Sequence, residues 1–210
     1  MRVQKMFDLS CDPEIIYEKL QVMNKIKPDL CVLGTRLPGC FDPFEMSLRA
    51  VLGQQITVKA ASTLASRLVE AYGIPIETGQ EGLTHIFPSS EMLFGFGESV
   101  TNKLGELGVI SSRSKTIFLL AQALVSKELD FDSNIDVEYE LNKLKNIHGI
   151  GPWTANYIAM RAMGWTDVFL ETDAGIKKAM TPCTSKELVE MSQAWRPWCS
   201  YATINIWNSL

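Results

Sequence analysis

Residues 144–161 read LKNIHGIGPWTANYIAMR, and this stretch decides the fold of the chain. Gly149 and Gly151 flank a single isoleucine, and glycine permits backbone angles that are closed to other residues. Pro152 suits the first turn of a following helix, where its missing N–H is not needed. The pattern predicts a helix, a tight hairpin and a second helix.

Such a hairpin has a property that a longer loop lacks. Without bulky side chains it can come very close to a partner, and the helix that starts at Pro152 leaves free N–H groups pointing outward. That combination favours binding of a phosphate group. The alternative is a plain turn between two packed helices.

The composition sets limits on the class of protein. The chain has 210 residues, of which 46% are hydrophobic and 21% charged, which is ordinary for a globular protein of one or two domains. Its formal net charge of −4 means that binding to an anionic polymer would need a local basic patch. Five cysteines without a CxxC pair, and only two histidines, argue against a disulfide framework, a zinc site or an iron–sulfur cluster. No segment approaches the ~20 apolar residues of a membrane span, so we expect a soluble intracellular protein.

The rest of the chain shows helical spacing of apolar residues and little alternation with period two, which predicts an all-α fold. A break near Gly53–Thr57 separates two helices, the second of which stops at Gly73. The other expected helices cover residues 13–26, 89–94, 101–107, 112–124, 137–146, 153–163, 174–180, 185–194 and 200 onward.

Residues 144–180 resemble the helix-hairpin-helix DNA glycosylase superfamily, and within it the alkylation-repair branch of bacterial 3-methyladenine DNA glycosylase II. Three further stretches resemble the same branch in the same order: MFDLSCDPEII, LPGCFDPFEMSLRAVLGQQ and AWRPWCSYATINIW. The resemblance covers nearly the whole chain. We expect the N-terminal α/β domain of this branch to be missing, so that the chain is a short member or a fragment.

The resemblance implies two helical lobes with a DNA-facing cleft between them. Residues 42–163 form the lobe that carries the hairpin, and residues 1–41 with 164–210 form the lobe that carries a catalytic aspartate. The expected partner is damaged double-stranded DNA, with no membrane and no second subunit. The expected location is the cytoplasm, at the nucleoid.

The resemblance also assigns roles in the hairpin. The backbone amides of Gly149, Gly151 and Trp153 grip DNA phosphates. A monovalent cation, Na⁺ or K⁺, is held there by the main-chain carbonyls of Lys145, Ile147 and Ile150, and it adds positive charge where a phosphate must sit. Lys145 is the basic side chain expected close to DNA, and the other candidates for a basic patch are Arg113, Lys115, Lys143, Arg161, Lys177 and Lys178.

Asp173 is the candidate catalytic residue, because the motif FLETDAGIKKAM matches the position of the superfamily's aspartate. It stands at the expected start of a helix, so Asp173 or Thr172 could also be a simple N-cap. Both roles are compatible. A helix N-terminus favours an ionised carboxylate, which would stabilise a cationic sugar as the base departs.

Trp153, Tyr157 and Trp207 are candidate walls of a pocket for a flipped base, again by resemblance. Trp153 and Tyr157 lie four residues apart and share a helix face, which is more often a core pattern. Alkylated bases such as 3-methyladenine and 7-methylguanine carry positive charge, which favours stacking on electron-rich rings. Ala174 departs from the tyrosine of close relatives, so the pocket is expected to be wider or differently selective.

Gln55, in the stretch LGQQITV, matches the residue that wedges into the duplex and fills the gap left by the flipped nucleotide. Gln54 and Ile56 compete for this role, and all three could merely shape the turn.

The expected activity is hydrolysis of the N-glycosidic bond of alkylated purines, without strand cleavage. Trp153 occupies the position at which strand-cutting members of the superfamily carry a lysine nucleophile. No cofactor is expected to be required beyond the hairpin cation, and no iron–sulfur cluster is expected. The alternatives are another branch of the superfamily with lyase activity, and a DNA-binding module without catalysis.

Overall fold

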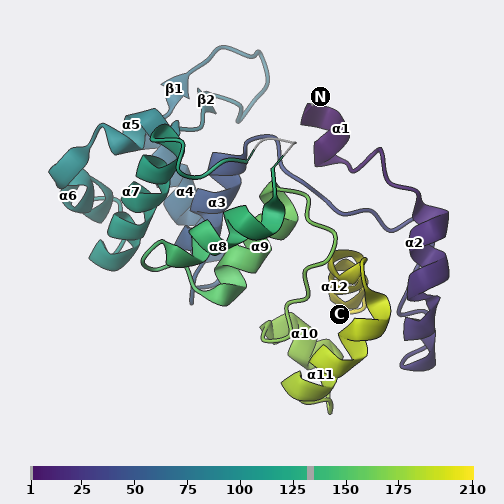
Figure 1. The fold of residues 1–210 in the computed structure, drawn as a ribbon. Helices are drawn as coiled ribbons and strands as arrows, with labels where there is room; N and C mark the ends of the chain where they lie inside the picture. Colours follow the sequence, from purple (N-terminus) through teal and green to yellow (C-terminus); the bar gives the residue numbers. More distant parts are fainter. Residues whose placement is uncertain (1, 132–134) are drawn as a thin grey trace. The chain divides into compact units, whose positions relative to one another are not determined.

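The computed structural model describes residues 2–131 and 135–210, and it divides into two compact units. The hairpin unit comprises Asp42–Ala155, and the aspartate unit comprises Met1–Phe41 with Asn156–Leu210. The sequence placed the second boundary after residue 163, whereas the observed one falls inside helix α9 (Pro152–Ala162). The reason is that α9 continues without a break from the hairpin into the aspartate unit. The predicted all-α fold is confirmed (Figure 1).

The hairpin unit is built around helix α7 (Ser111–Val125), whose Ile117 and Leu120 are completely buried. Helix α7 packs against α3, α5 and α6. The helices of this unit, besides the first turn of α9 and the 3-10 turn Gly97–Ser99, are α3 (Pro43–Leu52), α4 (Val58–Tyr72), α5 (Ser90–Phe94), α6 (Val100–Gly105), α7 and α8 (Val137–Asn146).

The helix starts in this unit follow from local sequence. Asp42, Thr57, Ser89 and Asp136 each accept a backbone N–H of the following first turn through a side-chain oxygen. A small antiparallel pair, β1 (Ile74–Pro75) and β2 (His85–Ile86), was not predicted. Two-residue strands are too short to show a period-two pattern.

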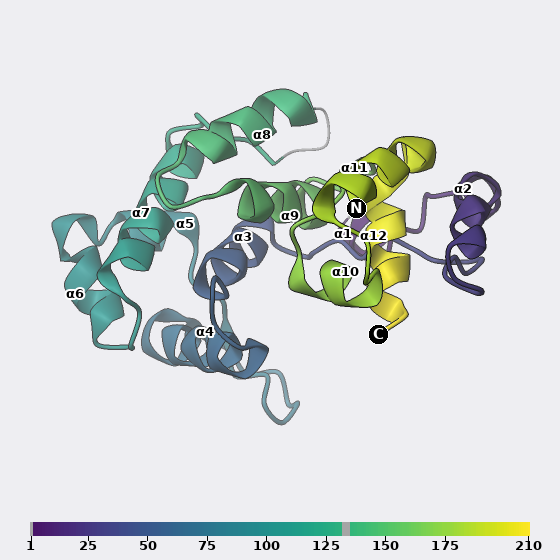
Figure 2. The same cartoon turned by 90° about the horizontal axis from the view of Figure 1, so that it is seen from below.

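The aspartate unit is built around α12 (Cys199–Asn208), in which every residue from Cys199 to Ile206 is buried. Helix α10 packs against α12, and α11 lies beside them in both views (Figures 1 and 2). The remaining elements are α1 (Arg2–Met6), α2 (Pro13–Leu20), the later turns of α9, α10 (Ala174–Ala179), α11 (Ser185–Ser192) and the 3-10 turns Gln21–Lys25 and Gln193–Trp195. The predicted helix 13–26 thus divides into α2 and a 3-10 turn, and α1 was not predicted.

Polar side chains of α12 fix the segments around it. The Asn205 Oδ1 accepts the Val32 N–H at 3.0 Å, and the Ser200 hydroxyl donates to the Trp165 carbonyl at 2.6 Å. Tyr201 donates to the Asp8 carboxylate at 2.8 Å, and burial raises the pKa of the Tyr201 hydroxyl. These contacts hold both the N-terminal segment and the loop that leads to α10.

Across residues 2–131 and 135–210, no helix combines the length and apolar character that crossing a membrane requires. The same residues contain no group of three or more His, Cys, Asp or Glu side chains arranged to hold a metal ion.

Candidate active site

The hairpin between α8 and α9 is a closed turn. Helix α8 ends at Asn146, and the Ile150 N–H donates to the Ile147 carbonyl at 3.0 Å. Ile150 is buried and anchors the turn in the unit's core. Helix α9 starts at Pro152, as the sequence predicts.

The two hairpin glycines serve different purposes. Gly149 has a φ of +91°, and a Cβ at this position would overlap the Thr116 Oγ1. Gly151 does not use the left-handed region, and a Cβ there would meet no atom within 4 Å. The prediction that both glycines need unusual backbone angles is therefore wrong for Gly151. This residue instead leaves the outer face of the turn clear.

Two side chains from neighbouring elements hold the hairpin backbone. The Thr116 hydroxyl of α7 lies 3.0 Å from the His148 carbonyl and 3.0 Å from the Ser112 carbonyl of its own helix, and shares its one hydrogen between them. The Gln54 amide, from the turn between α3 and α4, donates to the Gly149 carbonyl at 3.0 Å and to the Thr154 hydroxyl at 3.1 Å. Because these bonds fix successive carbonyls, they also fix the directions of the N–H groups in the turn.

The basic candidates near the hairpin differ in how they are engaged. Lys145 is exposed in the last turn of α8. Lys143 pairs with Glu140 at 2.7 Å and lies over the Tyr139 ring, and the hydrogen bond to Glu140 raises the pKa of Lys143. Arg113 donates to the Gln54 carbonyl.

Asp173 is the N-cap of α10. Its Oδ1 accepts the Ile176 N–H at 3.0 Å and the Trp207 indole N–H at 2.8 Å. Within the described ranges, both hydrogen bonds of this carboxylate go to Oδ1, so the lone pairs of Oδ2 are not engaged by them. The two donors orient the carboxylate from its own helix and from α12.

Gly175 leaves room for the contact between the Asp173 carboxylate and the Trp207 indole. It was not among the predicted site residues. A Cβ on Gly175 would lie 3.1 Å from the Asp173 Oδ1 and 3.3 Å from the Trp207 Cδ1. Both distances are tighter than ordinary contact, so a larger residue would press on the indole–carboxylate bond. The feature of the sequence that could have pointed to it is the glycine that directly follows Ala174 in the motif.

The aromatic candidates are divided between the two units. Tyr157 and Trp207 meet edge to face in the aspartate unit, with ring centroids 6.3 Å apart. Arg161 lies over the Tyr157 ring at 5.8 Å from its centroid. Trp153 stands one turn before Tyr157 on α9, in the residues assigned to the hairpin unit. The structure thus brings Asp173, Tyr157 and Trp207 together.

The turn between α3 and α4 distinguishes the three wedge candidates. Gln54 is bonded to the hairpin, so entering a duplex would break its bonds to Gly149 and Thr154. Ile56 lines a groove on the same unit. Gln55 is exposed, with a φ of +56°, which makes it the protruding residue of the turn.

Two family models match the chain. Residues 48–190 match the HhH-GPD superfamily base excision DNA repair protein, and residues 1–42 match the AlkA N-terminal domain. The latter stretch therefore corresponds to part of the N-terminal domain that we expected to be absent.

Among curated proteins, the chain is 40% identical to a probable bifunctional transcriptional activator/DNA repair enzyme AlkA of Mycobacterium tuberculosis, covering 100% of this chain and 42% of that protein. It is 34% identical to DNA-3-methyladenine glycosylase 2 of Escherichia coli, covering 98% of this chain and 70% of that protein. The chain thus spans less than half the length of the mycobacterial relative.

Solved structures share the fold at low identity. A 3-methyladenine DNA glycosylase from Archaeoglobus fulgidus aligns with a TM-score of 0.74 at 22% identity, covering 98% of this chain and 72% of that one. An 8-oxoguanine glycosylase/lyase from Clostridium acetobutylicum, bound to DNA, aligns with a TM-score of 0.79 at 19% identity over the same shares.

Proposed function

Because the chain belongs to the HhH-GPD superfamily of base excision DNA repair proteins, we propose that it is a monofunctional DNA glycosylase for alkylated purines in duplex DNA. The substrates are bases of the 3-methyladenine and 7-methylguanine type, and the products are the free base and an abasic site. Relatives at 31–34% identity that are named DNA-3-methyladenine glycosylases support this choice.

The geometry of Asp173 carries the proposal. Its Oδ1 is held by the Ile176 N–H and the Trp207 indole, and its Oδ2 faces no such donor within the described residues. A carboxylate fixed at one oxygen presents the other in a constant direction. Preorganised negative charge of this kind stabilises a positive charge that develops in a transition state.

The reaction needs only that charge and a water molecule. The bond between the base nitrogen and the sugar C1′ breaks, and its electron pair leaves with the base, which neutralises the alkylated ring. The sugar becomes oxocarbenium-like and is stabilised by the Asp173 carboxylate. Water adds to C1′ and loses a proton, and the abasic strand stays intact.

The rings of Tyr157 and Trp207 give the aspartate a neighbouring aromatic wall. Their edge-to-face contact fixes both planes, and Trp207 is also tied to the carboxylate. Electron-rich faces attract a cationic base more strongly than a neutral one. By resemblance Trp153 is a further candidate for stacking, and Ala174 is smaller than the tyrosine of close relatives.

The hairpin is the proposed phosphate grip. Its amides at Gly149, Gly151 and Trp153 lie in a turn whose carbonyls are fixed by Thr116 and Gln54. The carbonyls of Lys145, Ile147 and Ile150 suit a monovalent cation, since they are neutral oxygen donors and no carboxylate is among them. The Ile147 oxygen already accepts the Ile150 N–H and retains a second lone pair. A bound cation would add positive charge beside the phosphate.

A base-release assay tests this function and its two alternatives. The protein is incubated with methylated duplex DNA, and free 3-methyladenine is measured by chromatography, with duplexes carrying other damaged bases in parallel. We expect release of alkylated purines. Binding without release of any base would favour the non-catalytic module, and release of oxidised bases with strand cleavage would favour the lyase branch.

A further inference from the structure

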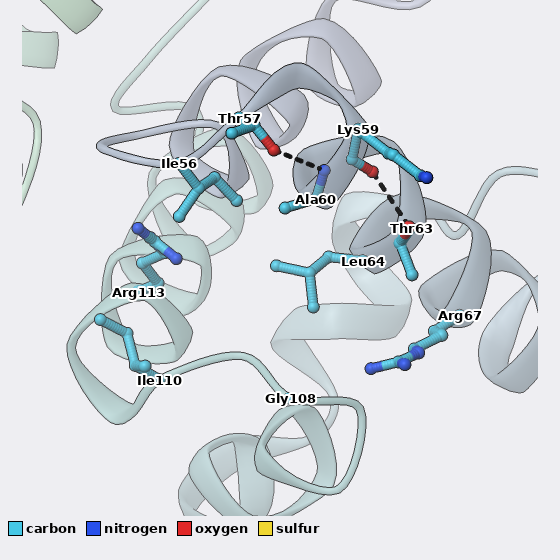
Figure 3. Close-up of a pocket in the computed structure, with 10 residues that line it drawn as sticks. All are labelled: Ile56, Thr57, Lys59, Ala60, Thr63, Leu64, Arg67, Gly108, Ile110 and Arg113. Carbon is cyan, nitrogen blue, oxygen red and sulfur yellow. Dashed lines mark hydrogen bonds between the residues drawn. The ribbon is translucent and has the colours of Figure 1, made fainter.

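A groove of about 590 Å³ opens on the hairpin unit, beside the turn between α3 and α4 (Figure 3). Helix α4 forms one wall, and the segment from Gly108 to the start of α7 forms the other. Its apolar surface is provided by Ile56, Leu64 and Ile110. Ile110 is 55% exposed, so the apolar lining is open to a ligand.

The charged side chains of the groove are all basic. Lys59, Arg67 and Arg113 line it, and no acidic residue is among the described residues that do. This is unusual for a chain whose formal net charge is −4. Within the described residues none of these three cations forms an ion pair, which favours a polyanionic ligand.

The two arginines are positioned by the backbone. Arg67 donates through NH1 to the Leu107 carbonyl at 3.1 Å, and Arg113 donates through NH2 to the Gln54 carbonyl. Figure 3 shows them on opposite sides of the groove, with Leu64 between them. Since a guanidinium has five N–H donors, each arginine keeps donors for a ligand after its backbone contact.

The groove and the hairpin are joined by one turn. Gln54 reaches the hairpin through the Gly149 carbonyl, and Ile56 lines the groove two residues later. Between them stands Gln55, the exposed residue proposed as the wedge. A side chain that enters a duplex has one strand on each side of it.

We propose that the groove binds the backbone of the DNA strand opposite the lesion, with phosphates on Arg67 and Lys59 and deoxyribose against Leu64. This rests on the proposed function, in which the hairpin holds the damaged strand. The mixed lining matches the ligand, because a nucleic acid backbone alternates anionic phosphates with sugars of largely apolar surface. Both strands would then be held by one unit.

The salt dependence of binding tests the proposal. Binding of the protein to a fluorescent duplex with an abasic-site analogue, and to the damaged strand alone, is measured by anisotropy over a range of salt concentrations. The variants are Lys59→Gln and Arg67→Gln, with Lys186→Gln, an exposed lysine of α11, as the matched control. Circular dichroism establishes that each variant is folded.

We expect each groove variant to reduce the slope of log affinity against log salt by about 0.9 on the duplex, and to lower the affinity at 0.1 M salt by about eightfold. Binding to the single strand and the behaviour of Lys186→Gln stay as in the wild type. An unchanged duplex slope in Lys59→Gln and Arg67→Gln overturns the proposal, as does an equal loss on the single strand. If Arg67→Gln does not fold, Lys59→Gln decides alone.

The base-release assay and the salt-dependence experiment can fail independently of each other. A protein that releases no alkylated base but shows the expected duplex-specific slopes would lose the enzymatic function and keep the groove.

Discussion

At the scale of single residues, the two hairpin glycines are alike in sequence and different in the structure. Gly149 lies in the left-handed region against Thr116, whereas Gly151 faces open space. Gly149 is needed for the protein's own packing, whereas Gly151 keeps a surface clear for a ligand. Substitutions at the two positions should therefore change different properties.

Gly149→Ala is expected to lower the free energy of unfolding by at least about 2 kcal/mol, because a strained φ costs about 1–3 kcal/mol and the added methyl overlaps the Thr116 hydroxyl. Chemical denaturation of the variant and the wild type measures the difference. A variant as stable as the wild type would mean that the turn relaxes at no cost.

Gly151→Val is expected to leave the stability within about 1 kcal/mol of the wild type, since a Cβ at this position meets no atom within 4 Å. Its affinity for duplex DNA should fall by about tenfold or more, because the side chain separates the hairpin amides from a phosphate. Anisotropy titration measures this. Unchanged affinity in the folded variant would rule out the hairpin contact.

The site could be predicted from sequence only where a motif position fixes the residue. Asp173, Tyr157 and Trp207 come from three separate stretches of the chain, and the structure brings them together. Gly175 and Thr116 were not found, because their roles lie in contacts with residues far along the chain. No local pattern carries that information.

At the scale of elements, the hairpin depends on what surrounds it. Helix α7 supplies Thr116, and the turn between α3 and α4 supplies Gln54. The hairpin geometry is therefore a property of several elements of the hairpin unit rather than of the hairpin sequence alone.

Thr116→Val tests this dependence, because valine keeps the shape of threonine and removes the hydroxyl. The bond to the His148 carbonyl is lost, which should cost about 1 kcal/mol of stability and lower DNA affinity several-fold as the turn loosens. Thr181→Val is the control, since the Thr181 hydroxyl donates to the Lys177 carbonyl of the preceding helix α10 and makes no bond to the hairpin among the described residues. Equal DNA affinity in the two folded variants would show that the hairpin needs no support from α7.

Helices with a clear N-cap were predicted well. Helix α8 runs over Val137–Asn146 as the sequence indicates, with Asp136 as its cap. The β1–β2 pair was missed, because two-residue strands are too short for periodicity to appear, and α1 was missed although α5, of the same length and capped by Ser89, was predicted. The boundary inside α9 was missed because nothing in an uninterrupted helix marks where its contacts change from one unit to the other.

At the scale of the whole molecule, the chain carries a net negative charge although its proposed ligand, DNA, is also an anion. The cations that face the ligand are few and local, while the net charge is −4. The salt dependence of DNA binding should accordingly amount to a slope of about 0.9 for each cation that contacts a phosphate, with little long-range attraction.

The type of reaction, base release alone or base release with strand cleavage, is also a property of the whole chain. In the proposed function, Trp153 takes the position at which a lyase would carry its lysine, and Lys145 lies before the hairpin on α8. We expect that borohydride added during turnover traps no covalent protein–DNA adduct, because no amine attacks the sugar. A trapped adduct that disappears on changing one lysine to alanine would move the protein to the lyase branch.

Asp173→Asn removes the charge on which the proposed reaction depends. Asparagine keeps the shape and the capping oxygen but removes the charge, so the transition state loses its counter-charge while the hairpin is unaffected. The measurement is the rate of 3-methyladenine release from methylated duplex DNA, with anisotropy titration of the same variant as the control. We expect a rate lowered by about 100-fold or more with DNA affinity retained; normal release by the folded variant would exclude Asp173 as the catalytic charge.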